Sequence, residues 1–217
     1  MPGTHHLVEF ILASAAIILV PGPSVMFVIA RAIAWGRATA FMTAVGNALG
    51  MIVLSTVIAI GLGPLLQRSH ALLEVVQVLG GLYLVYLGRD ALRHREEHAN
   101  DMVTVTGTKP QGLVTIRQGF TVGVLNPKAL VFFSAVFPQF VDEEAGSLTF
   151  QLLMFGVIFA VLALLMDGTW GLLVGSSRDW FANSQGRLVA LRTMGGVVMC
   201  GLGVLVIIPV ALAHLRG

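Results

Sequence analysis

Four places within apolar stretches of the sequence carry groups that could bind a small charged molecule. They are the Pro21-Gly22-Pro23 triplet, Asn47, the Asn126-Pro127-Lys128 triplet and Asp167. The ammonium of Lys128 and the carboxylate of Asp167 could together hold a zwitterion, whose carboxylate would lie near Lys128 and whose amino group would lie near Asp167. Asp167 could also take up a proton when its partner leaves, which would couple binding to proton movement.

The prolines contribute backbone groups rather than side chains. Proline has no N–H, so the carbonyl four residues earlier loses its helical hydrogen-bond donor. In lipid such a carbonyl must be satisfied by a neighbour, water or a ligand. A helix broken at either triplet would therefore offer carbonyl oxygens to a cation, and the start of its second half would offer N–H groups to a carboxylate.

The elements that must position these groups are transmembrane helices. The chain has 217 residues, of which 56% are hydrophobic and 11% charged, whereas a soluble domain carries roughly 25% charged residues. We therefore expect one all-α membrane domain over residues 1–217. Six segments are long and apolar enough to cross a bilayer core of about 30 Å; they are 7–30, 38–63, 71–88, 119–140, 149–175 and 193–213.

Basic residues are distributed unevenly between the connecting segments. Ten of the 13 lysines and arginines follow the first, third and fifth predicted spans, two lie on the other side, and Lys128 lies within a span. By the positive-inside rule, the side with ten is cytoplasmic and both termini lie outside. Each of the four polar places is then eight or nine residues from the cytoplasmic end of its span. This is a depth of about 12–14 Å, near the middle of the membrane.

The chain also contains a weak internal repeat. GPSVMFV from Gly22 aligns with NPKALVF from Asn126, and each begins in the first span of a three-span half. An odd number of spans per half gives the two halves opposite orientations, as in the inverted repeats of many secondary transporters. The sequence predicts repeat 1 over about 7–88, a cytoplasmic linker over about 89–118 and repeat 2 over about 119–213, with helices 1 and 4 broken.

Less specific interpretations of these residues remain open. The first proline triplet could merely kink a packed helix, and Asn47 could be an interhelical hydrogen-bonding residue. Lys128 and Asp167 could form a buried pair with a purely structural role. His94 to His98 match the H-x-x-E-H pattern of zinc proteases, but they lie in RHREEHAND, which we interpret as a solvated charged loop without a pocket. We expect neither a metal site nor a cofactor.

Four stretches and one acidic residue together resemble a known family. The stretches are LVPGPSVMFV, GNALG, GGLYLVYLGRDALR and GFTVGVLNPKALVFFSAVFPQFV, and the acidic residue is Asp167. In these features the chain, from about residue 7 to 215, resembles the LysE/RhtB family of bacterial amino-acid exporters. The resemblance implies export of an amino acid or derivative, such as homoserine, threonine, lysine or leucine, across the inner membrane and driven by protons. It also implies that the two proline triplets are the family's two motifs.

The residues and the resemblance together predict an inner-membrane secondary transporter, not an enzyme, that exports an amino acid or derivative by proton antiport. The predicted partners are a zwitterionic substrate, protons and lipid but no nucleic acid, with a homodimer possible. A divalent-metal-ion exporter is an alternative, although it would need clustered carboxylate, His or Cys ligands at membrane depth. A membrane-embedded enzyme is a further alternative. The candidate substrate-binding residues are Pro21, Gly22, Pro23, Asn47, Asn126, Pro127, Lys128 and Asp167, and Asp167 is also the candidate proton-coupling residue.

Overall fold

The structure is a computed structural model that describes residues 3–66, 70–103, 108–142 and 145–216. All regular elements within these residues are helical. In chain order they are α1 (Thr4–Leu19), α2 (Pro23–Trp35), α3 (Arg37–Leu66), α4 (His70–Arg93), α5 (Arg95–Val103), α6 (Gly112–Val124), α7 (Pro127–Val131), η1 (Phe132–Val136), η2 (Phe137–Phe140), α8 (Leu148–Ser176), α9 (Arg178–Ala182) and α10 (Gln185–Arg216).

Four single helices and two bent pairs give up to six membrane crossings, if each bent pair is one span. The helices α3, α4, α8 and α10 are each long and apolar enough to cross a membrane. The pair α1 and α2 meets the same test when taken together and is bent by 51°. Helix α6 and the helical segment that follows it, Pro127–Phe140, form the second pair, which is bent by 41°. The predicted all-α membrane fold with broken helices 1 and 4 is therefore confirmed.

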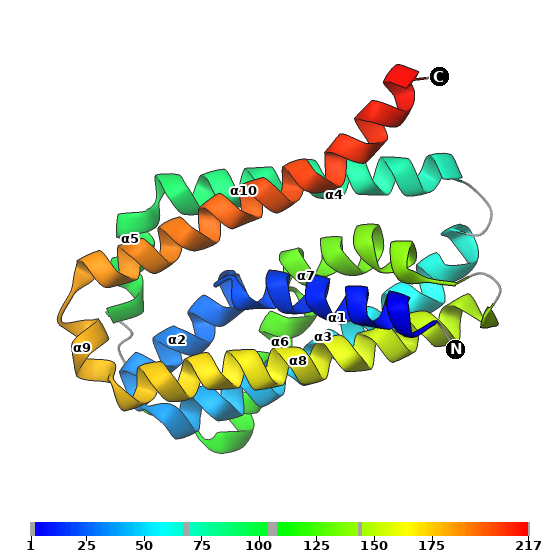
Figure 1. Ribbon diagram of the computed structural model, residues 1–217. Helices are drawn as coiled ribbons and strands as arrows, with labels where there is room; N and C mark the ends of the chain where they lie inside the picture. Colours follow the sequence, from blue (N-terminus) through cyan, green and yellow to red (C-terminus); the bar gives the residue numbers. More distant parts are fainter. Residues whose placement is uncertain (1–2, 67–69, 104–107, 143–144, 217) are drawn as a thin grey trace.

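The packing relates two three-span halves to each other. Figure 1 shows α4 and α10 side by side along one side of the molecule, and the remaining long helices are grouped beneath them. Within that group α3 packs against α8, so the second and third spans of each half contact their counterparts. Helix α3 also packs against α6, and α8 packs against α1 and α2. This exchange of partners is what a two-fold relation between the halves requires. Both termini lie toward the same end of the long helices (Figure 1), as six crossings demand.

Several helices extend beyond the apolar segments that the sequence delimits. Helix α4 continues to Arg93, α6 begins at Gly112 and α10 begins at Gln185. Hydropathy locates only the part of a helix that lies in hydrocarbon, whereas intrahelical hydrogen bonds continue into the polar interface. The interpretation of RHREEHAND as a loop is wrong, because residues 95–103 form α5, which packs against α2 and α10.

Helices α3 and α6 approach each other closely along a line of glycines. Gly46 and Gly50 of α3 face Gly119 and Gly123 of α6, and a Cβ atom added at any of the four would collide with the backbone of the opposite helix. Such glycine pairs let helices make close contact where lipid supplies no hydrophobic driving force. Asn47, next to Gly46, is therefore held at a fixed position beside the second helix break.

One end of the helix group is filled by aromatic side chains. Phe10, Phe133, Phe137, Phe155 and Phe159 are all at most 1% exposed. Their rings are joined by stacked, tilted and edge-to-face contacts with centroid separations of 4.3 to 6.2 Å. The cluster closes the space between α1, α8 and the segment after α7 on the side of the N-terminus.

Candidate functional site

Lys128 lies at the first helix break, although it belongs to the second half of the chain. Its side chain is buried, and its ammonium donates hydrogen bonds to the carbonyl oxygens of Ile17 and Val20, both at 2.9 Å. In an unbroken helix the Ile17 carbonyl would accept from residue 21, but Pro21 has no N–H. The Val20 carbonyl loses its helical donor because the backbone is extended at Val20 and Gly22. The carbonyls freed by the break thus bind the protein's own ammonium group.

Gly22 makes room for the end of the lysine side chain. A Cβ atom at this position would lie 3.0 Å from Lys128 Nζ and 3.1 Å from its Cε. The backbone angles of Gly22, φ −92° and ψ −173°, are available to any residue. The glycine therefore accommodates the close approach of Lys128, which a Cβ atom would push away by a few tenths of an ångström, and is not needed for backbone conformation.

The second break is held mainly by its own residues. The Asn126 side chain caps α7, since its Oδ1 accepts hydrogen bonds from the backbone N–H groups of Lys128 at 3.1 Å and Ala129 at 3.4 Å. Its Nδ2 donates to Ser24 Oγ at 3.1 Å, which ties the second break to the first. Pro127 begins α7 as Pro23 begins α2, so the two aligned prolines occupy equivalent positions.

Asp167 is bonded to Asn47 rather than to Lys128. Asn47 Nδ2 donates to Asp167 Oδ2 at 2.8 Å, and both side chains are 1% exposed. The two remaining oxygens, Asn47 Oδ1 and Asp167 Oδ1, are buried and have no hydrogen-bond partner. Within the described residues Lys128 and Asp167 form no ion pair within 4.0 Å, and their charges interact at longer range. Each charged group therefore has its own polar partner in this conformation.

The two charged groups line one small cavity, which we call the central cavity. Its wall includes Asn126, Lys128 and Asp167, together with Ser24 and Phe159. The space open to the centre of a water molecule is about 10 Å³, which is about enough for one water. The central cavity must widen before it can hold an amino acid, so this conformation is occluded.

The Pro21-Gly22-Pro23 triplet lies between two spaces. Its residues line a second cavity of about 200 Å³, which they share with Asp90, His98 and Arg192 among others. The structure thus brings Asn126, Lys128 and Asp167 together at the central cavity, with Asn47 bonded to Asp167 and Pro127 starting the helix that carries Lys128. The first triplet contributes to the central cavity through the carbonyls that it leaves without a helical donor.

Three residues that bind Lys128 or line the central cavity were not identified from the sequence. The carbonyl of Ile17 could have been found by counting four residues back from Pro21. Ser24 occupies the position that aligns with Lys128 in the repeat, and this correspondence could have identified it. Val20 had no comparable signal, because its carbonyl is freed by the extended conformation of the chain and not by a proline at residue 24.

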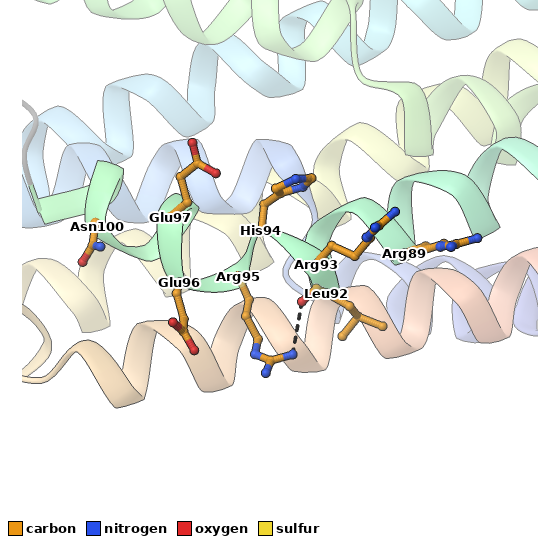
Figure 2. Close-up of a pocket in the computed structure, with 8 residues that line it drawn as sticks. All are labelled: Arg89, Leu92, Arg93, His94, Arg95, Glu96, Glu97 and Asn100. Carbon is orange, nitrogen blue, oxygen red and sulfur yellow. Dashed lines mark hydrogen bonds between the residues drawn. The ribbon is translucent and has the colours of Figure 1, made fainter.

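The H-x-x-E-H stretch forms part of a helix whose polar side chains diverge. Figure 2 shows His94 and Glu97 on one side of this helix and Arg95 and Glu96 on the other. They line an outer hollow of about 740 Å³, in which Arg95 donates to the Leu92 carbonyl at 3.2 Å. No group of three or more His, Cys, Asp or Glu side chains able to hold a metal occurs in the part of the chain that the structure describes.

Comparison with known proteins gives a consistent family. A model of the LysE type translocator family matches residues 15–209, which include both helix breaks and Asp167. An uncharacterized membrane protein of Pseudomonas aeruginosa is 32% identical over 200 residues, which cover 90% of this chain and 91% of the relative. A leucine efflux protein of Klebsiella pneumoniae is 30% identical over 165 residues, which cover 76% and 74% of the two chains. No solved structure matches the chain.

Proposed function

Because the chain belongs to the LysE type translocator family, we propose that it is a secondary transporter that exports an amino acid or amino-acid derivative by proton antiport. The membrane in question is the bacterial inner membrane, with both termini outside, as the distribution of basic residues favours. The relative named a leucine efflux protein makes leucine the first substrate to test.

The observation that carries this proposal is a buried ammonium and a buried carboxylate around one cavity. Charged groups at membrane depth are costly and are therefore functional candidates by default. Lys128 would bind the substrate carboxylate. The ammonium of the substrate would lie against Asp167 Oδ1 and Asn47 Oδ1, the two buried acceptors without a partner. A zwitterion would thus satisfy groups that the protein alone does not.

Proton coupling is assigned to Asp167 on the same grounds. After the substrate ammonium has left, an unpaired buried carboxylate would be expensive to maintain, and a proton removes its charge. Asp167 would therefore bind either the substrate ammonium or a proton. Because the two alternate at one carboxylate, substrate and protons would cross the membrane in opposite directions. Asn47 would keep the carboxylate in place through both stages, since it donates to Oδ2 and leaves Oδ1 for the exchanging partner.

Substrate binding would also free the first helix break. Lys128 cannot bind a carboxylate fully while its ammonium is held by Ile17 and Val20. As the lysine turns toward the substrate, these carbonyls lose their donor and the bend between α1 and α2 is free to change. Alternating access would follow from movement of one half against the other around the central cavity.

Vesicles that contain the purified protein provide the test. They would be loaded with labelled amino acids, leucine first, and efflux would be followed with and without an acidic exterior. We expect efflux that the pH gradient accelerates. The proposal is wrong if no amino acid leaves the vesicles under either condition.

The proton-coupling role has its own variant, Asp167→Asn. The asparagine can still accept the hydrogen bond from Asn47 but cannot bind a proton at neutral pH. We expect efflux of wild-type substrate to lose its acceleration by the pH gradient. Glu97→Gln is the matched control, because this exposed carboxylate lies outside both cavities at the first break. Full pH dependence in Asp167→Asn would refute the role of Asp167.

A further inference from the structure

The cavity on the other side of the Pro21-Gly22-Pro23 triplet is far larger than the central cavity. It measures about 200 Å³, against about 10 Å³. Besides the triplet, its wall includes Asp90 of α4, His98 of α5 and Arg192 of α10. These residues lie at the end of the molecule that the basic residues predict to be cytoplasmic. We call this space the Arg192 cavity.

Two of the residues that line the Arg192 cavity each have a nitrogen atom without a hydrogen-bond partner. Arg192 Nε and His98 Nδ1 are both buried and make no hydrogen bond. Asp90 and Asp101 interact with the Arg192 charge only at longer range, and no ion pair with Arg192 occurs within 4.0 Å in the described segments. Buried polar groups in native proteins are nearly always paired. The Arg192 guanidinium can only donate, so its unpaired N–H favours a ligand with acceptor atoms, and His98 adds a second donor when its Nδ1 carries the proton.

A carboxylate fits this arrangement. A guanidinium group has a planar set of donors that matches the two oxygens of a carboxylate. Helix α2 begins at the same cavity, but Pro23 has no N–H and the next two N–H groups belong to Ser24 and Val25, which line the central cavity. The carboxylate would therefore depend on Arg192 and His98. Asp90, which contacts His94 at 3.0 Å, places a carboxylate in the same wall where an ammonium group could be accommodated.

The position of the Arg192 cavity connects it to Lys128. Gly22 lines the Arg192 cavity, yet a Cβ atom at Gly22 would lie 3.0 Å from Lys128 Nζ. The triplet thus lines the Arg192 cavity and contacts Lys128 of the central cavity, whose ammonium binds the Ile17 and Val20 carbonyls just before the triplet. We propose that the Arg192 cavity is a loading site, in which Arg192 and His98 bind the substrate carboxylate before it is transferred past the triplet to Lys128. This inference rests on the proposed export of an amino acid.

The first test separates binding from turnover. In vesicles whose cytoplasmic face is outward, Arg192→Gln should raise the KM for leucine by about tenfold or more, the effect of losing a charge-assisted hydrogen bond, and should change the maximal rate much less. Arg187→Gln is the matched control, because Arg187 lies on the same helix but stacks on Trp180 outside the cavity. An unchanged KM in Arg192→Gln would overturn the loading site.

A second measurement does not depend on the folding of the Arg192 variant. Ala91 is 7% exposed and lines the Arg192 cavity, so Ala91→Cys in a Cys200→Ser background places one thiol there. Leucine on the cytoplasmic face should slow alkylation of this thiol by a maleimide, whereas leucinamide, which has no carboxylate, should not. Equal protection by both compounds, or by neither, refutes carboxylate binding at this site.

The outcomes distinguish the loading site from the proposed function. If the wild-type protein exports leucine but leucine gives no protection, the loading site is wrong and amino-acid export stands. If the wild-type protein exports a different member of the panel, that amino acid and its amide replace leucine and leucinamide. If no amino acid is exported, the proposed function fails, and the loading site fails with it.

Discussion

The two helix breaks have equivalent prolines but are stabilised in different ways. Pro23 and Pro127 each occupy the first turn of the helix that follows the break. At the second break the Asn126 side chain binds two N–H groups of its own helix. At the first break no side chain caps the helix, and the freed carbonyls of Ile17 and Val20 depend on Lys128 from the other half of the chain.

This difference assigns unequal roles to the two halves. A cap made by a short side chain to its own helix persists as long as the helix does. A bond from a long, flexible lysine can be exchanged for a bond to a substrate without unfolding either helix. We therefore expect the first break to be the one that changes during transport, and the second to stay fixed and carry the lysine.

The largest effect is expected from Lys128→Met, which removes the ammonium and keeps most of the side-chain volume. Both carbonyls at the first break lose their donor, and the site loses its positive charge. We expect efflux to fall by about 100-fold or more, the usual range when one partner of a buried charged interaction is removed. Unfolding in detergent should also occur at a lower temperature. Near wild-type efflux would show that the first break does not depend on Lys128.

A smaller effect is expected from Gly22→Ala, which leaves every hydrogen-bonding group in place. The added methyl group would press on the last atoms of Lys128, which must move away from the two carbonyls. Overpacking typically costs about 1–3 kcal/mol, so we expect efflux to fall by about tenfold. Gly201→Ala is the matched control, since no atom lies within 4 Å of the position where its Cβ would be built. Equal efflux in the two variants would contradict the close approach at the first break.

The smallest effect on transport is expected from Asn126→Ala. Loss of the cap should lower the free energy of unfolding by about 1 kcal/mol, while efflux should fall less than in Gly22→Ala. The unfolding free energy in detergent and the efflux rate, measured on the same preparation, test this. A loss of efflux greater than that of Gly22→Ala would mean that the second break, and not the first, is the adjustable one.

The sequence predicted the apolar helices and their two breaks, because these follow from hydropathy and from the positions of the prolines. The membrane depth of the polar groups stays a prediction. The sequence did not predict which groups bind each other. Opposite charges at equal depth suggested that Lys128 and Asp167 pair, but the fold brings the lysine to carbonyls that the first break leaves without donors. That contact spans more than 100 residues, so it depends on how the two halves pack and not on any local pattern.

Arg192 was missed for a related reason. The sequence assigned it to a cytoplasmic connection, since the apolar segment begins only at residue 193. In the structure α10 begins at Gln185, so Arg192 lies within the helix and faces the cavity beside the first break. Likewise, the charged residues around His98 suggested a loop, but they belong to a helix in which Ala99 is buried. In both places a few inward-facing residues are hidden among polar neighbours.

The contact between α3 and α6 has a mechanical consequence. Side chains at a helix interface usually allow the two helices to slide slightly past each other, because the side chains can change rotamer. Between Gly46, Gly50, Gly119 and Gly123 no side chain intervenes, so sliding by even one residue would drive a Cβ atom into backbone. We therefore expect α3 and α6 to move as one rigid unit, in which Asn47 and the second break keep their relative positions. The helices that rearrange during a transport cycle would then move relative to the α3 and α6 unit.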